Sequence, residues 1–302
     1  MSAEPRDPLA RLRSVRGFVF DLDGTLVLGD NLNKSIKPLP GAISLTQYLQ
    51  QRGMPFVILT NGTTRTPEQY AATLREIGFA VSERMILTPS AVAADYLARR
   101  RFKRVMVLGG TGVSAPLEAA GIRIVRPAKP ADRSESETVG DAADAVFVGW
   151  YREFSMNDLE GACQAVWAGA RLFTSSLAPY FATAHGKALG TSRAICAMIT
   201  SLTGQRAKVL GKPSLEALRC AGRRLGIDPT GLAVVGDDPA LEVRMALRGG
   251  SLAIAVHTGV GSEAAFAALP ANAQPDLSLA GVSELLERWI GATAFPIGSK
   301  LS

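Results

Sequence analysis

Short apolar runs recur along the chain, and most of them end in polar or small residues. Their length is that of buried strands rather than of helices. Runs rich in Val, Ile, Leu and Phe without polar alternation are typical of parallel strands that are covered on both faces. The runs that we expect to form strands are 18–20, 55–59, 85–87, 105–108, 122–125, 145–148, 171–174, 209–210, 232–235 and 252–256.

Segments with helix start and stop signals lie between these runs. Thr66, Pro67 and Gln69 have the spacing of a capping box, and Ser214 is placed to cap a helix that Gly226 ends. Strands that alternate with helices predict an α/β fold with parallel sheets. The expected helices are 41–53, 66–78, 90–100, 113–120, 155–168, 190–203, 214–225, 238–247 and 282–290.

The strand-helix pattern predicts one α/β unit that is interrupted by another. With 302 residues, the chain is long enough for two domains. We expect residues 1–88 and 187–302 to form a Rossmann-like parallel-sheet core and residues 89–186 to form an inserted α/β domain, because each sheet needs its own helical cover. Segments without helical periodicity are read as a lead-in, a flap beside the first strand end and an irregular loop, at 1–16, 29–40 and 127–144.

The composition is that of a globular protein without a membrane span. Hydrophobic residues make up 47% and charged residues 20% of the chain, and no signal-peptide pattern is present. Three widely spaced cysteines indicate reduced core thiols, so we expect a cytoplasmic protein. The net charge of +6 favours anionic partners. The basic run 99–104 lacks interleaved aromatic residues, so it is read as solvated surface and no nucleic-acid partner is expected.

Four of the predicted strands in the outer unit end in residues that carry chemistry. In open parallel sheets, ligands bind outside the carboxyl ends of the strands, so these ends should converge on one crevice. Paired acids, a hydroxyl and a lysine are the groups that phosphoryl transfer requires. The residues are Asp21 and Asp23, Thr60 and Asn61, Lys212, and Asp237 and Asp238.

The first of these ends, Asp21-Leu22-Asp23, is the one around which the site is expected to form. In extended geometry Asp21 and Asp23 share a face while Leu22 turns into the core. Two such carboxylates suit Mg²⁺, which prefers one or two carboxylates with water and substrate phosphate. A polar strand-to-turn junction is the alternative, because Asp and Gly are common turn residues.

These sequence motifs, taken in order, resemble those of a known enzyme family. DLDGTL at 21–26, LTNGTTRT at 59–66, GKPS at 211–214 and VGDD at 235–238 resemble the four motifs of haloacid dehalogenase superfamily phosphatases. The inserted unit, beginning ILTPSAVAADYL at 86–97, resembles the C2 cap of the IIA branch, which includes p-nitrophenylphosphatase-like enzymes. The resemblance implies a phosphatase of a small phosphorylated metabolite, with a homodimer formed through the cap.

The resemblance also implies a role for each motif residue. Asp21 would attack phosphorus to form an aspartyl-phosphate, and Asp23 would act as general acid and then as general base. Thr60, with the amides of Asn61 and Gly62, would hold phosphoryl oxygens.

Charge neutralisation and metal binding follow from the same resemblance. Lys212 would neutralise charge on the nucleophile and the phosphoryl group. Mg²⁺ would be held by Asp21, the carbonyl of Asp23 and Asp237. Gly24, in the first motif, is placed with the substrate-binding residues.

Three features depart from the family pattern. The aspartate usually found five residues after the first acid of the fourth motif is Glu242 here, so either Glu242 or Asp238 would support the metal. The cap stretch usually written TNPD is SSLA at 175–178, and the flap is longer than usual. Cap residues that are expected to select the substrate are Arg152, Tyr180 and His185.

Two other functions are compatible with parts of the sequence. Gly110, Gly112 and Ala115 fit a dinucleotide fingerprint between a strand and a helix, and Arg126 could meet the extra phosphate of NADP. A redox protein is therefore one alternative, and a glycine-rich turn without a ligand is the plainer reading. A non-catalytic module that binds a phosphorylated ligand is the other alternative, although both Asp21 and Asp23 are retained.

Overall fold

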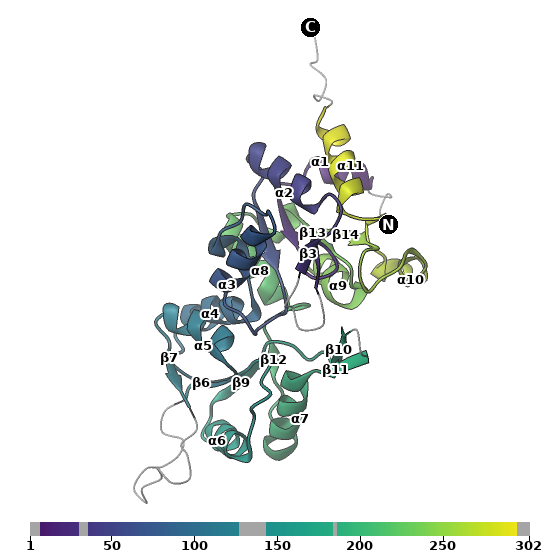
Figure 1. Cartoon of the computed structure of the whole chain (residues 1–302). Coiled ribbons are helices and arrows are strands. Elements are labelled where there is room, and N and C mark those ends of the chain that lie inside the picture. Colours follow the sequence, from purple (N-terminus) through teal and green to yellow (C-terminus); the bar gives the residue numbers. More distant parts are fainter. Residues whose placement is uncertain (1–6, 30–35, 127–142, 184–185, 295–302) are drawn as a thin grey trace, which may run out of the picture. The chain divides into compact units, whose positions relative to one another are not determined.

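The computed structural model describes residues 7–29, 36–126, 143–183 and 186–294 (Figure 1). The chain forms two compact units. The first unit consists of Met1–Leu59, Ala71–Met85 and Ala221–Ser302, and the second of Thr60–Tyr70 and Ile86–Cys220. Both are built from strands and helices in alternation, so the predicted α/β class with parallel sheets is confirmed. The predicted boundaries of the core (1–88 and 187–302) and of the inserted domain (89–186) differ from the boundaries of these two units. The division into a core and an inserted domain stays a prediction.

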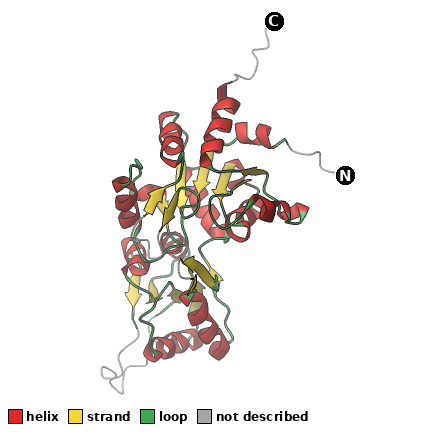
Figure 2. Cartoon of the chain, turned by 45° about the vertical axis from the view of Figure 1, so that its right-hand side comes forward, coloured by secondary structure: helices red, strands yellow, loops and turns green. Residues whose placement is uncertain are grey.

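The first unit is organised around a parallel sheet with β1 in its interior. Its strands run in the order β15-β14-β13-β1-β4, and β1 is paired in parallel with both β13 and β4. Figure 2 shows helices on both sides of these strands. The strands are β1 (Gly17–Phe20), β4 (Phe56–Leu59), β13 (Leu232–Gly236), β14 (Leu252–Val256) and β15 (Leu277–Leu279).

Helices of the first unit cover this sheet, and short helical turns connect its elements. The helices are α1 (Pro8–Arg13), α2 (Ala42–Gln51), α9 (Arg244–Gly249), α10 (Glu263–Ala267) and α11 (Val282–Ala294). The short turns are η1 (Glu83–Met85), η3 (Pro229–Gly231), η4 (Pro239–Val243) and η5 (Ala271–Ala273).

Aromatic rings fix β1 within its unit. All four residues of β1 are buried. The rings of Phe18 and Phe20 are stacked, Phe18 meets Trp289 of α11 edge-on, and Phe20 meets Phe56 of β4 edge-on. Each such pair adds about 0.5–1.5 kcal/mol beyond the burial of its area. The strand that leads to Asp21 is therefore held from two directions.

Two segments that were expected to be irregular contain regular structure. Within the lead-in, Asp7 caps α1 and Leu12 is fully buried. Within the flap, β3 (Ile36–Pro38) pairs as an antiparallel hairpin with β2 (Val27–Gly29), which ends at the first residue of the flap, while 30–35 lies outside the described residues. The periodicity of these segments was too short to reveal either element, since the helix has six residues and the strands have three.

The second unit has its own parallel sheet, in the order β12-β9-β8-β6-β7. Its strands are β6 (Arg104–Leu108), β7 (Arg123–Val125), β8 (Ala145–Val148), β9 (Arg171–Thr174) and β12 (Lys208–Val209), with β5 (Ile86–Leu87) and the antiparallel hairpin of β10 (Tyr180–Thr183) and β11 (Gly186–Leu189) outside this sheet. Its helices are α4 (Pro89–Arg99), α5 (Thr111–Ala119), α6 (Met156–Trp167) and α7 (Thr191–Thr203). The division between the units falls inside α3 (Pro67–Glu76) and α8 (Leu215–Leu225).

Helices α6 and α7 close one apolar core over β8 and β9. Leu159 of α6 and Ile195 of α7 belong to the same cluster of buried side chains, together with Cys163 and Cys196. Burial raises the pKa of the Cys196 thiol to about 11, against a smaller lowering by a hydrogen bond with Thr174. The prediction of core thiols is confirmed, because all three cysteines are buried and none is in a disulfide.

The glycine-rich turn between β6 and α5 has a packing explanation. A Cβ atom at Gly112 would lie 2.5 Å from the carbonyl oxygen of Thr63 and 2.8 Å from the amide nitrogen of Arg65. In a dinucleotide site the second glycine instead lets the backbone approach a pyrophosphate. Here the backbone of Thr63 and Arg65 occupies the space beside Gly112. This contact favours the interpretation of the segment as a packed turn without a ligand.

A substitution at Gly112 separates these two explanations. Gly112→Ala should lower the Tm of the protein, because backbone atoms cannot move aside as a flexible side chain can. Addition of NADP⁺ or NADPH to the wild-type protein should leave its Tm unchanged in a thermal-shift assay. A saturable rise in Tm with either nucleotide would contradict the packed-turn explanation and restore the redox alternative.

Asp276 joins the unpredicted helix α1 to the sheet of the first unit. Its carboxylate pairs with Arg11 of α1 and accepts the amide of Ala253 at the start of β14. We expect Asp276→Ala to destabilise the protein by about 1–3 kcal/mol, because a backbone donor and a guanidinium both lose their charged acceptor. Urea denaturation measures this loss. Glu287→Ala, which removes the same charge from an exposed position of α11, is the control and should change stability little.

Candidate active site

The end of β1 places Asp21 in a buried position beside β13. Strands β1 and β13 are paired with Phe20 opposite Val235, and the amide of Asp21 donates to the carbonyl of Val235 at 2.9 Å. The Asp21 residue is only 5% exposed, and the Thr25 hydroxyl donates to its Oδ2 at 3.2 Å. A buried carboxylate whose orientation is fixed in this way is suited to bind a cation or to act as a nucleophile.

Asp23 lies in a tight turn rather than on the strand. Strand β1 ends at Phe20, and the amides of Leu26 and Val27 both donate to the carbonyl of Leu22. Leu22 is buried, as expected, whereas the two acids differ, because Asp21 is buried and Asp23 is exposed. The extended geometry that was expected to place both acids on one face ends before them, because the turn begins directly after β1.

Asp237 follows β13, next to the strand end that carries Asp21. It is 4% exposed, and its Oδ2 accepts the amide of Val260. The chain closes tightly around this carboxylate, since Cβ atoms at Gly24 and Gly259 would lie 2.5 and 1.9 Å from its Oδ2. Gly24 also has a φ of +87°, a conformation that favours glycine. The need for glycine at position 24 is thus explained by both its conformation and the space that Asp237 takes.

Glu242 and Asp238 have different local roles. Glu242 is 2% exposed, and its Oε2 accepts the amide of Asp238 at 3.1 Å. Asp238 instead caps η4, a single π-helical turn, by accepting the amide of Ala240 at 2.7 Å. A Cβ atom at Gly236 would lie 2.2 Å from Cγ of Glu242, so the glycine makes room for the glutamate side chain. Such π turns recur at functional sites.

The second unit holds the hydroxyl, amide and lysine of the other motifs. Thr60 is buried, with its amide donating to the carbonyl of Leu87. The Asn61 side chain makes two reciprocal hydrogen bonds with the backbone of Lys212, at 2.8 Å from the lysine amide and 3.1 Å to its carbonyl. Lys212 is 3% exposed. Sequence reasoning assigned Asn61 only a backbone role, so this side-chain contact with the lysine segment is new.

Gly62 is already engaged within its own loop. Its amide donates to the Thr60 hydroxyl at 3.0 Å, and a Cβ atom there would lie 2.0 Å from the Tyr70 hydroxyl. The glycine is therefore required by its neighbour Tyr70. Its amide is occupied by Thr60 in this structure, whereas the resemblance assigns that amide to a phosphoryl oxygen.

The cap stretch that departs from the family pattern forms a local turn. The Ser176 hydroxyl accepts the amide of Ala178 at 3.1 Å, and the carbonyl of Ser175 accepts the amide of Gly211. A Cβ atom at Gly190 would lie 1.9 Å from the carbonyl oxygen of Ala178, which shows how closely these segments pack. Ser176 thus stabilises a local turn at a position where the family pattern has Asn.

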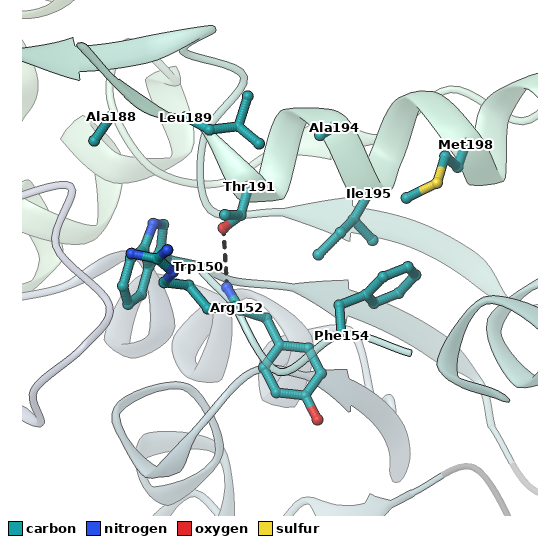
Figure 3. A pocket seen from close by; sticks show the side chains of 10 residues that line it. Trp150, Arg152, Phe154, Ala188, Leu189, Thr191, Ala194, Ile195 and Met198 are labelled. Carbon is teal, nitrogen blue, oxygen red and sulfur yellow. Dashed lines mark hydrogen bonds between the residues drawn. The ribbon is translucent and has the colours of Figure 1, made fainter. Parts of the chain in front are cut away.

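Of the three cap residues predicted to select the substrate, the two that the structure describes lie on different elements. Tyr180 is 46% exposed on β10, and Arg152 is an exposed side chain on the rim of a cavity that lies wholly within the second unit. His185 lies outside the described residues. Figure 3 shows Arg152 together with Trp150, Phe154 and Thr191, which sequence reasoning did not select. Aromatic residues in a loop form no recognisable sequence motif, so their place in the cavity wall is seen only in the structure.

The chemistry of the donors at the end of β1 and β13 fits Mg²⁺. Asp21 and Asp237 provide hard oxygen ligands from adjacent buried strand ends. Mg²⁺ uses one or two carboxylates and completes its shell with water and phosphate, so these two side chains fit its preference. In the described part of the chain, no three His, Cys, Asp or Glu side chains gather into a metal-binding group.

Among the helices that the structure describes, none is both long enough and apolar enough to cross a lipid bilayer.

Comparison with known proteins supports the resemblance read from the motifs. Residues 18–123 match the haloacid dehalogenase-like hydrolase family, and residues 209–285 match a second family described as HAD-hydrolase-like. Mouse chronophin is 29% identical and is covered over 94% of its length by 91% of this chain. The 5'-nucleotidase YutF of Bacillus subtilis is 27% identical and is covered over 90% of its length by 82% of this chain.

A solved structure shares the fold as well as the sequence. The glycerol phosphate phosphatase of Mycobacterium tuberculosis, determined in complex with magnesium, has a TM-score of 0.75 and 26% identity, with 92% of this chain and 77% of that chain covered. The motif residues, both α/β units and these similarities agree. The chain therefore belongs to the haloacid dehalogenase-like hydrolases, in the C2-capped phosphatase branch that its motifs resemble.

Proposed function

We propose that the protein hydrolyses a small phosphate monoester through an aspartyl-phosphate on Asp21, with Mg²⁺ as cofactor. The observation that carries this proposal is the pair of buried carboxylates, Asp21 and Asp237, at the ends of the adjacent strands β1 and β13. Relatives named as 5'-nucleotidase, chronophin and acid sugar phosphatase support a phosphorylated substrate without selecting one.

The first step transfers the phosphoryl group to the protein. A carboxylate oxygen of Asp21 attacks phosphorus, the bond from phosphorus to the ester oxygen breaks, and Asp23 gives its proton to that oxygen. The hydrogen bond from the Thr25 hydroxyl keeps the Asp21 carboxylate in one orientation for this attack. The exposed position of Asp23 suits a group that must exchange protons with the leaving group and with water.

The second step releases phosphate. Asp23, now ionised, takes a proton from water, whose oxygen attacks phosphorus, and the bond from phosphorus to Asp21 breaks to regenerate the carboxylate. Lys212 and the Thr60 hydroxyl are assigned to the phosphoryl oxygens, and the Asn61 side chain fixes the backbone of the lysine. Bound Mg²⁺ would offset the negative charge that Asp21, Asp237 and the phosphoryl group bring together.

Substitutions of the two acids of the first motif should have different effects. Asp21→Asn should abolish turnover of every substrate, because a neutral amide cannot form the aspartyl-phosphate. Asp23→Asn should reduce kcat for an alkyl phosphate more than for p-nitrophenyl phosphate, whose leaving group needs less protonation, and the loss should reach about 10²–10⁴-fold. Steady-state kinetics on both substrates, with circular dichroism as the folding control, measures these effects.

The outcomes that contradict these roles are distinct. Retention of more than a few per cent of kcat by pure Asp21→Asn would remove the nucleophile assignment. Equal losses on the two substrates in Asp23→Asn would argue against Asp23 as the general acid.

The metal dependence should separate Glu242 from Asp238. We propose that Glu242 positions the segment that carries Asp237, because its carboxylate accepts the amide of Asp238. Glu242→Gln keeps an oxygen that can accept this amide but removes the buried negative charge that strengthens the hydrogen bond. It should therefore raise the Mg²⁺ concentration that gives half-maximal rate by about 10–100-fold, with a smaller fall of kcat at saturating Mg²⁺. Asp238→Asn, which retains an oxygen that can cap η4, is the matched control and should shift this midpoint little.

Titration of Mg²⁺ against the rate of p-nitrophenyl phosphate hydrolysis measures both variants. An unchanged midpoint in Glu242→Gln together with a shifted midpoint in Asp238→Asn would show that the supporting acid is Asp238 instead.

A further inference from the structure

A cavity of about 540 Å³ lies within the second unit, between the loop that follows β8 and the first half of α7 (Figure 3). Its size is within the range that small-molecule sites occupy. Three aromatic side chains, those of Trp150, Tyr151 and Phe154, and five aliphatic ones line it. The rings of Tyr151 and Phe154 meet edge-on, with 6.4 Å between their centroids. Such walls favour a ligand with a flat apolar body.

The frame of the cavity is fixed by a backbone contact. The amide of Tyr151 donates to the Thr191 hydroxyl oxygen at 3.0 Å, which ties the loop to the start of α7. Along α7, Thr191, Ala194 and Ile195 lie on one face of the helix and line the cavity. The cavity is therefore held between two ordered elements of the same unit.

The polar groups that line the cavity are donors. Arg152 offers a guanidinium, and Thr191 retains its hydroxyl hydrogen for donation. The indole of Trp150 contributes its ring to the wall, because its N–H is buried and not accessible from the cavity.

The described lining of the cavity carries no negative charge, because none of the described residues that line it is Asp or Glu. Burial raises the pKa of the Tyr151 phenol, Asp158 and Glu153 raise it further, and Arg126 lowers it, so the phenol stays neutral and can donate. Donors, one cation and apolar walls together suit an anion whose charge is carried by an otherwise hydrophobic molecule.

We propose that this cavity binds a small aromatic anion, with its ring between the apolar walls and its anionic group at Arg152 and the Thr191 hydroxyl. The ligand is either the leaving group of a phosphate ester or a separate molecule that carries the same chemistry. The binding itself does not depend on the proposed phosphatase activity. It is therefore tested without turnover.

Isothermal titration calorimetry of the full-length protein with 2-naphthoate tests the binding. The neutral analogue 2-naphthalenemethanol should bind at least about tenfold more weakly, because it lacks the charge that Arg152 recognises. Arg152→Gln should weaken 2-naphthoate binding by about tenfold, and Trp150→Phe should weaken it by a smaller factor. Ala194→Phe, which places a ring in the cavity, should abolish detectable binding.

Matched control variants change the same residue types elsewhere in the second unit. Arg171→Gln removes an exposed arginine at the start of β9, and Trp167→Phe alters a tryptophan that is 63% exposed at the end of α6. Ala197→Phe adds a ring at an exposed position of α7 that does not line the cavity. All three should bind 2-naphthoate as the wild-type protein does.

The results that would overturn the proposal are specific. No heat of binding at millimolar 2-naphthoate, or equal affinity in wild type, Arg152→Gln and Ala194→Phe, would show that the cavity is not an anion site. Loss of a dimer in Ala194→Phe, seen by sedimentation, with no binding in wild type would show that a second copy of the chain covers it instead.

Kinetics then distinguish the two sources of the ligand. If 2-naphthoate raises the KM for p-nitrophenyl phosphate without changing kcat, the cavity takes the leaving group of the substrate. If it binds by calorimetry and changes kcat or leaves both constants unchanged, the ligand is a separate molecule. Failure of p-nitrophenyl phosphate turnover would count against the phosphatase proposal and leave the calorimetric result intact.

Discussion

Two carboxylates buried at neighbouring strand ends are the constraint on which the first unit depends. Asp21 and Asp237 follow adjacent parallel strands, and each is 5% exposed or less. Buried like charges raise each other's energy unless a cation or hydrogen bonds compensate. The Thr25 hydroxyl and the amide of Val260 supply part of that compensation. The repulsion that these hydrogen bonds leave uncompensated is the physical reason for a divalent cation in the proposed reaction.

Glycines allow the backbone to surround these acids. Gly24 and Gly259 leave space for the Asp237 carboxylate, and Gly236 leaves space for Glu242. The departure from the family pattern at Glu242 is thus accommodated locally, because the glutamate packs over a glycine and its carboxylate accepts a backbone amide. A longer acid at this position changes how the segment is held and leaves the proposed metal ligand Asp237 at the end of the same strand.

Elements with strong apolar patterns could be predicted from the sequence, and those defined by tertiary contacts could not. The buried runs 145–148 and 252–256 predicted β8 and β14 with their observed bounds. Helix α1 was missed because a six-residue segment has too few apolar positions to show periodicity, and its anchor Asp276 is far along the chain.

The candidate site shows the same limit of sequence reasoning. Motif spacing selected Asp21, Thr60, Lys212 and Asp237, since each directly follows, or lies one or two residues after, an apolar run. The pairing of the Asn61 side chain with the lysine backbone connects residues 151 positions apart, so no local pattern could reveal it. The lining of the cavity in the second unit is likewise a property of packing rather than of sequence order.

Trapping of the covalent intermediate tests the central claim most directly. The wild-type enzyme would be mixed with a phosphate monoester and Mg²⁺, quenched in acid within the first turnovers and reduced with borohydride, which converts an aspartyl-phosphate to homoserine. Peptide mass spectrometry should then find homoserine at position 21, only when substrate was present. Homoserine at Asp23 or Asp237, or none at any position during active turnover, would contradict the account.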